Sequence, residues 1–191
     1  MPTFVILILL LGVISVALEN YALAQYYYPD QKNKVSEKKK AIVKPKMRLL
    51  STAFLNDGKI PKEYTCDGKN HSPPLSFMDI PKNAKSLALI MDDPDAPGGT
   101  FTHWLVWNIS PQKSQLAKGE KVTFPQGITS FGKSGYGGPC PPSGTHRYFF
   151  KLYALDTMLD LKSNSTKQDL EKAMKGHILE QSTLIGKYSR T

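Results

Sequence analysis

The sequence Tyr136-Gly-Gly-Pro-Cys-Pro-Pro-Ser-Gly-Thr-His-Arg-Tyr148 runs directly into Phe149-Phe150-Lys151-Leu152-Tyr153. Glycine and proline are so dense over residues 132–144 that no helix or paired strand can persist there, because proline lacks the backbone N–H and glycine has no side chain to pack. We therefore predict a loop, followed by a strand over residues 147–155. Two interpretations of the loop are open: a plain connection between strands, or a fixed cradle of backbone N–H groups edged by His146 and Tyr148.

A second polar cluster lies upstream of this loop. Residues 86–91 form a nearly continuous apolar run, which is typical of a strand buried on both faces. The run ends abruptly at Asp92, Asp93 and Asp95. These carboxylates are therefore expected at an edge of the sheet, where the chain leaves it.

The strand that follows, predicted over residues 102–109, contains the first histidine of interest. Strict alternation along this strand places His103 on the same face as Leu105 and Trp107. Polar residues at the ends of several strands, next to Pro/Gly loops, are expected to converge on one shallow pocket at one edge of the sheet.

The other segments after the first 46 residues are typical of a mostly β domain, because short apolar runs alternate with turn residues. We expect a first strand over 47–54 and an extended segment over 60–65. One helix is expected after the capping signal at Ser165-Thr166. Residues 178–185 are expected to continue that helix or to form a second short one that stops at Gly186.

The N-terminus has the composition of a targeting segment. An apolar run over 4–18 precedes the small-x-small site Ala22-Leu23-Ala24, which predicts a secretory signal peptide over residues 1–24. Residues 1–3 contain no Lys or Arg, so an uncleaved membrane anchor is the alternative. We therefore predict a secreted or extracytoplasmic protein, which is membrane-anchored if the leader is retained.

Residues 25–46 form a lysine-rich segment without apolar periodicity. They contain seven lysines against Asp30 and Glu37, a net charge of +5 in a chain of net charge +9. Low hydrophobicity and like charge predict a disordered tether, and its charge suits peripheral contact with an anionic membrane. Nucleic acid is not an expected partner, because the chain lacks a helix-turn-helix, a zinc finger and an aromatic RNA-binding motif. Residues 47–191 are the predicted folded domain.

The aspartates and histidines allow three chemical interpretations. Donating imidazoles beside glycine-rich backbone N–H groups would bind a phosphate or carboxylate. Neutral imidazoles with Asp93 would resemble a two-His-one-carboxylate metal site, but each ligand stands alone on its own element. A hydrolase would need a nucleophile, and Ser143 lies on a flexible loop outside any G-x-S-x-G elbow. We expect an anion pocket with no enzyme activity, no cofactor and no metal.

The only two cysteines, Cys66 and Cys140, are a candidate disulfide, because an even pair in an exported protein favours one. Pairing depends on their Cα separation, which a sequence does not give. Neither cysteine has a second Cys at zinc-ligand spacing, and His71 alone does not complete a zinc site.

Several spaced motifs, in this order, resemble the signature regions of the phosphatidylethanolamine-binding protein family, also called Raf kinase inhibitor-like proteins. The motifs are Asp93-Pro-Asp-Ala-Pro97, His103-Trp-x-x-x-Asn108, and Gly138-Pro-x-Pro-Pro-x-Gly144 leading into His146-Arg-Tyr148. The segments TCDG at 65–68, SPPL at 72–75 and GHIL at 176–179 are similar to the bacterial and archaeal branch. The resemblance covers residues 47–190.

This resemblance implies an antiparallel β-sandwich of a large and a small sheet with a C-terminal helix, and a small anion-binding pocket at one end. Motif matching assigns ligand-binding side chains, a loop wall and one residue that supports the loop. The ligand-binding side chains are those of Asp93, His103, His146 and Tyr148. Gly138 and Pro142 form the loop wall, and Asp95 supports the loop. Two carboxylates in one small pocket would repel each other, so Asp93 is expected to orient a histidine or accept a ligand's ammonium group, and Asp95 to hold the Gly98-Gly99 turn.

Members of the resembling family are ligand-binding or inhibitory proteins, including inhibitors of serine proteases, and no general catalytic activity belongs to the fold. The resemblance thus implies a protein that binds phosphate-type or zwitterionic head groups such as phosphoethanolamine, and the leader predicts that it is exported. A secreted serine protease inhibitor is the alternative. The C-terminal region of the longer eukaryotic members has no match here, so regulation of a kinase partner is not carried over.

Overall fold

The computed structural model describes residues 45–190, which fold into two β-sheets and one α-helix. The predicted signal peptide (1–24) and the predicted tether (25–46), apart from Pro45 and Lys46, lie outside the described residues. Over residues 45–190, no helix has the length and apolar character needed to cross a membrane.

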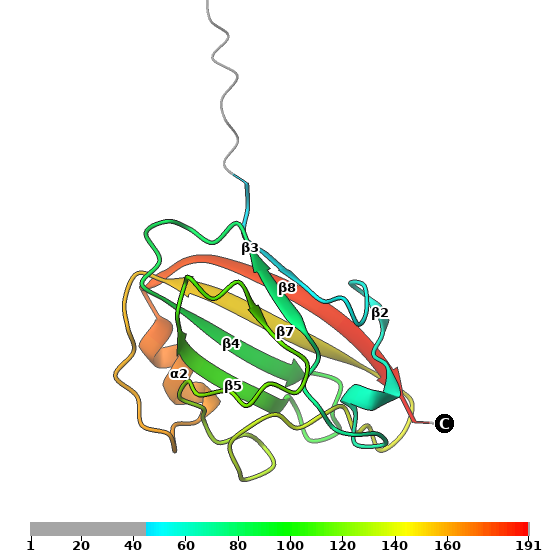
Figure 1. Ribbon diagram of the computed structural model, residues 1–191. Helices are drawn as coiled ribbons and strands as arrows, with labels where there is room; N and C mark the ends of the chain where they lie inside the picture. The colour runs from blue at the N-terminus through cyan, green and yellow to red at the C-terminus, as the bar shows by residue number, and fades with distance from the viewer. Residues whose placement is uncertain (1–44, 191) are drawn as a thin grey trace, which may run out of the picture. The chain divides into compact units, whose positions relative to one another are not determined.

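The large sheet has five strands, and the small sheet has three (Figure 1). The large sheet has the order β2 (Gly58–Lys59), β8 (Ile178–Ser189), β7 (Thr145–Leu155), β4 (Ser86–Asp93) and β5 (Phe101–Ile109). The small sheet has the order β1 (Arg48–Leu50), β3 (Leu75–Met78) and β6 (Gln115–Leu116). All neighbours are antiparallel except β2 and β8, which are parallel. The expected antiparallel β-sandwich with a large and a small sheet is thus confirmed.

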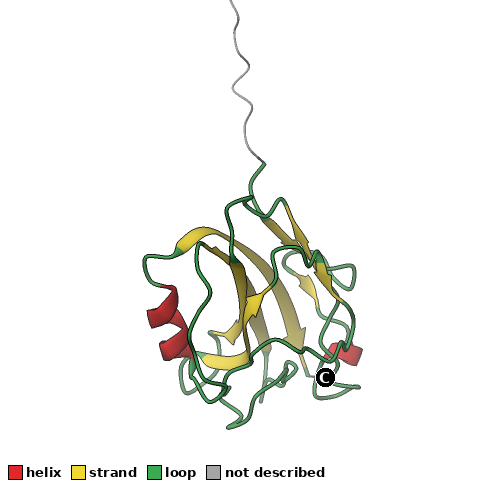
Figure 2. Cartoon of the chain, turned by 60° about the vertical axis from the view of Figure 1, so that its left-hand side comes forward, coloured by secondary structure: helices red, strands yellow, loops and turns green. Residues whose placement is uncertain are grey.

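Two apolar clusters hold three layers together. The larger cluster lies between the sheets and includes Leu49 and Phe77 of the small sheet and Phe150 of the large one. The smaller cluster packs the helix α2 (Lys167–Met174) against β4 and β5, through Leu170 and Met174. Figure 2 shows α2 at one side of the sheets. All eight residues of β4 are buried, as expected for a central strand covered on both faces.

The helix begins where its capping signal predicted. Thr166 is the N-cap, and its side chain accepts from the Asp169 backbone N–H while the Asp169 carboxylate accepts from the backbone N–H of Thr166. The expectation that residues 178–185 are helical is wrong. They belong to β8, which pairs with β7 from Thr145↔Ser189 to Leu155↔Ile178. Cross-strand pairing along this length overrides the local pattern.

Two extended segments are also shorter than expected. The first strand ends at Leu50, because the Ser51 side chain donates to the Pro74 carbonyl and accepts from the Ala53 N–H, which forms a turn. Within 60–65, residues Lys62–Tyr64 form the 3-10 helix η2.

The register between β4 and β5 contains an irregularity that matters for the site. Met91 pairs with Trp104, whereas the next residue, Asp92, pairs with Thr102. His103 is therefore an extra residue without a partner on β4, which makes it a β-bulge.

The bulge turns His103 away from the face predicted by strict alternation. Leu105 and Trp107 pack in the cluster beneath α2. The His103 ring instead lies 5.2 Å from that of Tyr148 and 5.1 Å from that of Phe101 (centroid distances). The prediction that His103 shares a face with Leu105 and Trp107 is wrong, because an inserted residue reverses the alternation at that point.

Candidate functional site

The candidate site lies where three neighbouring strands meet at one end of the large sheet. Asp93 is the last residue of β4, His103 follows the start of β5, and His146 and Tyr148 lie near the start of β7. Because β4 is antiparallel to both neighbours, its end lies beside their starts. His146 and Tyr148 are two residues apart on one strand and so share a face.

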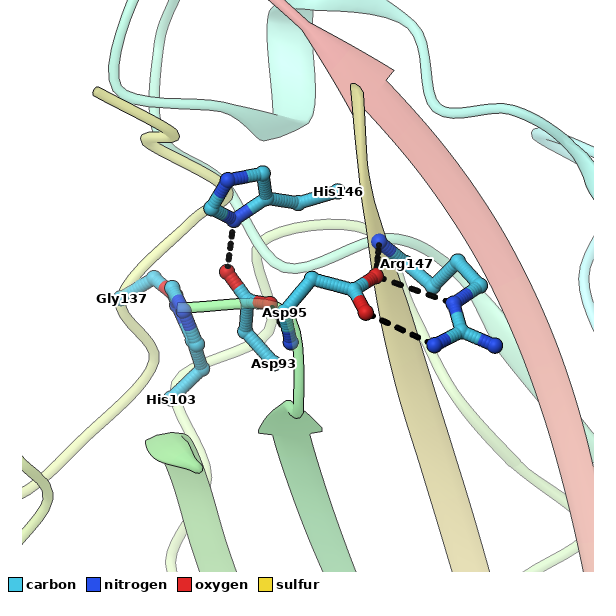
Figure 3. Close-up of polar contacts among 6 residues, drawn as sticks. All are labelled: Asp93, Asp95, His103, Gly137, His146 and Arg147. Atoms are coloured by element: carbon cyan, nitrogen blue, oxygen red, sulfur yellow. Dashed lines mark hydrogen bonds and ion pairs between the residues drawn. The ribbon is translucent and has the colours of Figure 1, made fainter. Parts of the chain in front are cut away.

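Asp93 and His146 form the central pair of the site (Figure 3). His146 Nδ1 donates to Asp93 Oδ2 at 2.7 Å, and both side chains are buried. The other carboxylate oxygen, Oδ1, accepts the backbone N–H of Asp95 at 2.9 Å. Asp93 therefore orients the imidazole and also closes the turn that follows β4.

His103 is held in a similar way by the Pro/Gly loop. Its Nδ1 lies 2.7 Å from the carbonyl oxygen of Gly137, so Nδ1 carries the proton and donates. Burial lowers the pKa of His103 below its ordinary value of 6.5, and outweighs the Gly137 hydrogen bond and the charge of Asp93, which act in the opposite direction. His103 is therefore neutral near pH 7, with a lone pair on Nε2.

Neither imidazole Nε2 has a hydrogen-bond partner among residues 45–190. Two nitrogens that accept when neutral and donate when protonated are thus left for another molecule.

The Tyr148 hydroxyl is also left without a partner. Tyr148 is fully buried, and its oxygen is one of two buried side-chain polar atoms that make no hydrogen bond in the described part of the chain. Burial, and then the charge of Asp93, raise the pKa of Tyr148, so the phenol keeps its proton. A buried hydroxyl without a partner is unfavourable, and a ligand that accepts a hydrogen bond from it would remove that penalty.

The Pro/Gly loop is fixed against the rest of the molecule at several points. The Gly138 N–H donates to Asn70 Oδ1 at 2.7 Å, and the Tyr136 hydroxyl donates to the Tyr64 carbonyl at 2.7 Å. A Cβ on Gly138 would lie only 2.4 Å from Asn70 Oδ1 and 2.5 Å from the Tyr64 oxygen, so only glycine fits there. The loop is therefore held in one conformation, and the N–H groups of Gly137 and Gly138 are used within the protein, where they donate to the His103 carbonyl and to Asn70.

Cys66 and Cys140 form a disulfide that joins this loop to the segment after η2. Their Cα atoms are 5.4 Å apart, within the range that a disulfide requires. The Cys66 N–H also donates to the carbonyl of Pro139 at 3.1 Å.

Asp95 does not hold the Gly98-Gly99 turn. The Gly99 N–H donates to the Ala96 carbonyl instead. The Asp95 carboxylate accepts from the backbone N–H of Arg147 and, through both oxygens, from its guanidinium (Figure 3). The hydrogen bonds and charge of Arg147 lower the pKa of Asp95 to about 2. Asp95 thus ties the loop after β4 to β7.

Two residues lie away from this cluster. Asp92 points to the opposite face, where its Oδ2 pairs with Lys151 at 2.9 Å and Lys167 at 2.8 Å. Pro142 is exposed, whereas Pro139 and Pro141 are buried, so the inner side of the loop contains other prolines than the one predicted.

Sequence reasoning missed several residues that shape the site. Asn70 has a left-handed backbone conformation (φ 56°), which asparagine adopts more readily than most residues. The presence of an asparagine in this loop is therefore the sequence signal that could have drawn attention to the position. Phe131 stacks edge-on against Phe101 and His103, with centroids 4.8 and 5.3 Å away. Nothing in the sequence around Phe131 predicts that contact.

Two hollows lie on the surface of the described residues near these elements. One of about 80 Å³ lies along the loop and is lined by Cys66, Cys140, Gly138 and Phe131, among others. A larger one, of about 500 Å³, lies at the start of α2, and no predicted site residue lines it.

Three of the hydroxyls that line the larger hollow already donate to other groups of the protein. Those of Thr102, Thr129 and Thr166 donate to Asp92, the Lys133 carbonyl and Asp169, respectively. We therefore assign the candidate site to the end of the sheet that contains Asp93 and the two histidines.

A metal would have to bind the free Nε2 atoms, because both Nδ1 atoms are already engaged. Across the described residues, no group of three or more His, Cys, Asp or Glu side chains is arranged to hold a metal ion.

These contacts define a class of protein: a β-sandwich with a buried His/Asp/Tyr cluster beside a disulfide-linked glycine loop. The family model described as "Phosphatidylethanolamine-binding protein" matches residues 50–189. The chain belongs to the phosphatidylethanolamine-binding protein family. Members of this family are generally ligand-binding proteins without catalytic activity.

Relatives and solved structures agree with this membership. The UPF0098 protein of Methanothermobacter thermautotrophicus is 52% identical over 150 residues, which cover 75% of this chain and 99% of the relative. The crystal structure of a phosphatidylethanolamine-binding protein homologue from Chlamydia trachomatis is 46% identical with a TM-score of 0.75, and covers 76% of this chain and 99% of that one. The E. coli protein YbcL, at 29% identity and a TM-score of 0.72, covers 77% of this chain and 100% of its own. These relatives are archaeal and bacterial, which agrees with the predicted bacterial and archaeal branch of the family.

Proposed function

We propose that this protein binds a small phosphate-type or zwitterionic head group, such as phosphoethanolamine, at the Asp93/His103/His146/Tyr148 cluster, and that it does so without catalysing a reaction. The observation that carries the proposal is the buried Tyr148 hydroxyl, which has no partner within residues 45–190 although the Tyr148 ring packs against the His103 imidazole, whose Nε2 is also without a partner there. Native proteins seldom leave such a group unsatisfied.

The protonation states suggest which ligands suit the cluster. Tyr148 keeps its proton and can donate to a phosphate oxygen. His103 is neutral in the free protein and accepts at Nε2, which suits a protonated phosphate oxygen or an ammonium group, whereas a bare phosphate oxygen at Nε2 requires the imidazolium. The carboxylate of Asp93 would repel a bare dianion, so a monoanion or zwitterion is the better match.

A titration tests this proposal. Purified full-length protein is titrated with inorganic phosphate and with phosphoethanolamine by calorimetry, beside a His103→Ala/His146→Ala double variant. We expect saturable binding that falls at least about tenfold in the variant, since each lost hydrogen bond to a charged group is worth roughly 1.5–3 kcal/mol. Equal affinity in both proteins would exclude the cluster as the binding site.

A secreted serine protease inhibitor is the second candidate. Residues 142–144 form an exposed run between the Cys140 disulfide and β7, and a loop fixed at both ends can enter a protease cleft without a large cost in ordering. Incubation with a panel of secreted serine proteases tests this directly. Inhibition that survives the histidine double variant would favour the inhibitor, because its loop does not depend on those side chains.

The proposal includes export, on the basis of the N-terminal sequence pattern over residues 1–24. The lysine-rich residues 25–46 would then be a tether that contacts anionic lipid. Intact-mass measurement of the protein recovered from the medium and from the membrane fraction tests both. A mass that corresponds to the uncleaved chain would favour the anchor.

A further inference from the structure

The Cys66–Cys140 disulfide lies on the surface, in the glycine loop whose Gly137 carbonyl accepts a hydrogen bond from His103. Both cysteines are exposed, so a thiol in solution can reach the bond. The bond spans 74 residues of sequence and connects the loop after η2 to the Pro/Gly loop. A crosslink at this place constrains the wall of the pocket in addition to the fold as a whole.

The disulfide is close to the groups that orient His103. Gly137, whose carbonyl accepts the hydrogen bond from His103 Nδ1, is three residues before Cys140. Gly138, whose N–H binds Asn70, is two residues before it. The same small hollow, of about 80 Å³, is lined by both cysteines and by Asn70, Gly137 and Gly138. Release of Cys140 would therefore loosen the residues that hold His103.

Tyr136, Gly137 and Gly138 are anchored by hydrogen bonds to Tyr64, His103 and Asn70, whereas over residues 139–142 the described contacts give the disulfide and one backbone hydrogen bond. The Cys66 N–H to Pro139 hydrogen bond depends on the two cysteine loops staying together. Pro139 and Pro141 supply no N–H groups, so the loop cannot replace the disulfide with new backbone hydrogen bonds at those positions.

We propose that the Cys66–Cys140 disulfide is a thiol-exchange site that acts as a redox latch on the pocket, opened by a dithiol reductant. The latch rests on the proposed function, because it controls the affinity of the same cluster for phosphate-type ligands. With the bond closed, Gly137 holds His103 in position. With the bond open, the loop of residues 136–142 has to be ordered again each time a ligand binds.

The exchange is an ordinary two-electron reduction. A thiolate of the dithiol attacks one sulfur of the disulfide, and the other cysteine leaves as a thiolate and takes up a proton. The second thiolate of the reductant then attacks the reductant's own sulfur in the mixed disulfide, and the second cysteine leaves as a thiolate and takes up a proton. The protein gains two thiols, and the reductant becomes its cyclic disulfide.

The test compares the oxidised and reduced forms of the full chain. Inorganic phosphate and phosphoethanolamine are titrated before and after reduction with dithiothreitol, and after reoxidation, with the thiols counted by alkylation and intact mass. Affinity is expected to fall roughly tenfold on reduction, because ordering even one loop residue costs about that factor. Reoxidation is expected to restore it. Unchanged affinity in protein with two alkylated thiols would overturn the latch.

Hydrogen exchange separates a local latch from a general crosslink. Amides over residues 136–142 and 66–70 are expected to exchange faster after reduction, while those of β4 and β7 keep their protection. Loss of protection throughout the sheet, or no change in the two loops, would show that the bond is not a latch. This readout stands even if the oxidised protein binds neither probe, a result that would reject the proposed function alone.

Two variants complete the design. Cys66→Ser/Cys140→Ser is expected to reproduce the reduced protein. Met174→Ala is the matched control, because Met174 is buried beneath the opposite face of the large sheet and touches neither loop. It lowers stability without freeing the loop, so its phosphate affinity is expected to equal that of the oxidised protein. An equal loss of affinity in Met174→Ala would overturn the latch.

Discussion

His146 Nδ1 and Asp93 Oδ2 lie 2.7 Å apart, with 9% and 5% of the two side chains exposed. This pair fixes the tautomer of His146, because a carboxylate can only accept and Nδ1 must therefore donate. The Nε2 atom is left without a hydrogen-bond partner among residues 45–190. The remaining carboxylate oxygen of Asp93 accepts a hydrogen bond from the Asp95 backbone N–H. The Asp93 side chain therefore links the loop after β4 to His146 at the start of β7.

Asp93→Asn is predicted to invert the tautomer of His146. An amide has one accepting oxygen, and if this stays on the Asp95 N–H, the NH₂ group faces His146 Nδ1 and requires it to accept. The proton then moves to Nε2. We expect a stability loss of about 1–3 kcal/mol from the weakened buried contact, and altered ligand preference. Nitrogen-15 shifts of the His146 ring measure the tautomer, and an unchanged Nδ1–H form would contradict the prediction.

Asp95→Asn is predicted to lower stability with little effect on binding. Asp95 contacts Arg147 at 2.7 Å and 2.9 Å, but the Arg147 side chain is half exposed, so the loss should be only about 1 kcal/mol. Because the folded pKa of Asp95 is lowered to about 2, its contribution is present above the unfolded pKa and lost as pH falls toward 2. Urea unfolding from pH 5 to pH 2 should show a shallower acid decline in the variant than in the wild type.

His103 is predicted to make phosphate binding stronger at lower pH. Burial lowers its pKa, so the unfolded chain binds the proton more tightly, and the free protein gains stability as pH rises from the lowered folded pKa to about 6.5. An anion at Nε2 favours the imidazolium and should draw a proton into the site. Calorimetry in buffers of different ionisation enthalpy should detect this uptake at pH 7. Absence of proton uptake would mean that His103 stays neutral in the complex.

Gly138→Ala is predicted to destabilise the protein by about 1–3 kcal/mol, because the new methyl group would overlap Asn70 Oδ1 and the Tyr64 carbonyl. Gly98→Ala is the matched control: nothing lies within 4 Å of the Cβ it would add. Its stability should change by less than about 0.5 kcal/mol. Melting temperatures of the two variants decide the matter, and similar values would mean that the loop can move aside.

Much of the site could be predicted from the sequence because its motifs stand at strand ends. The apolar run before Asp93 and the Pro/Gly loop before His146 indicate where strands stop and start, and both side chains do lie at one end of the large sheet. The face of His103 could not be predicted. It depends on a one-residue bulge, and the register of β4 against β5 is set by packing across the sheet.

The error at β8 has a related cause. Residues 180–183 are Glu, Gln, Ser and Thr, which give neither strand alternation nor a helical stripe. Their strand state comes from pairing with β7, and local sequence carries little information about such non-local hydrogen bonds. Asp95 was assigned to the wrong partner for the same reason, since Arg147 lies 52 residues further along the chain.

Tyr148→Phe is predicted to separate stability from binding. In the free protein the Tyr148 hydroxyl is buried without a partner, so its removal should leave stability unchanged or raise it by up to about 1 kcal/mol. If that hydroxyl donates to a bound phosphate, the same change should weaken phosphate affinity about tenfold.

Tyr136→Phe is the control, because its hydroxyl is also buried but donates to the Tyr64 carbonyl at 2.7 Å. That variant should lose about 1–2 kcal/mol of stability. Urea unfolding and phosphate titration of both variants give the four values needed, and a Tyr148→Phe protein that is destabilised yet binds phosphate normally would show that the hydroxyl serves the fold and not the ligand.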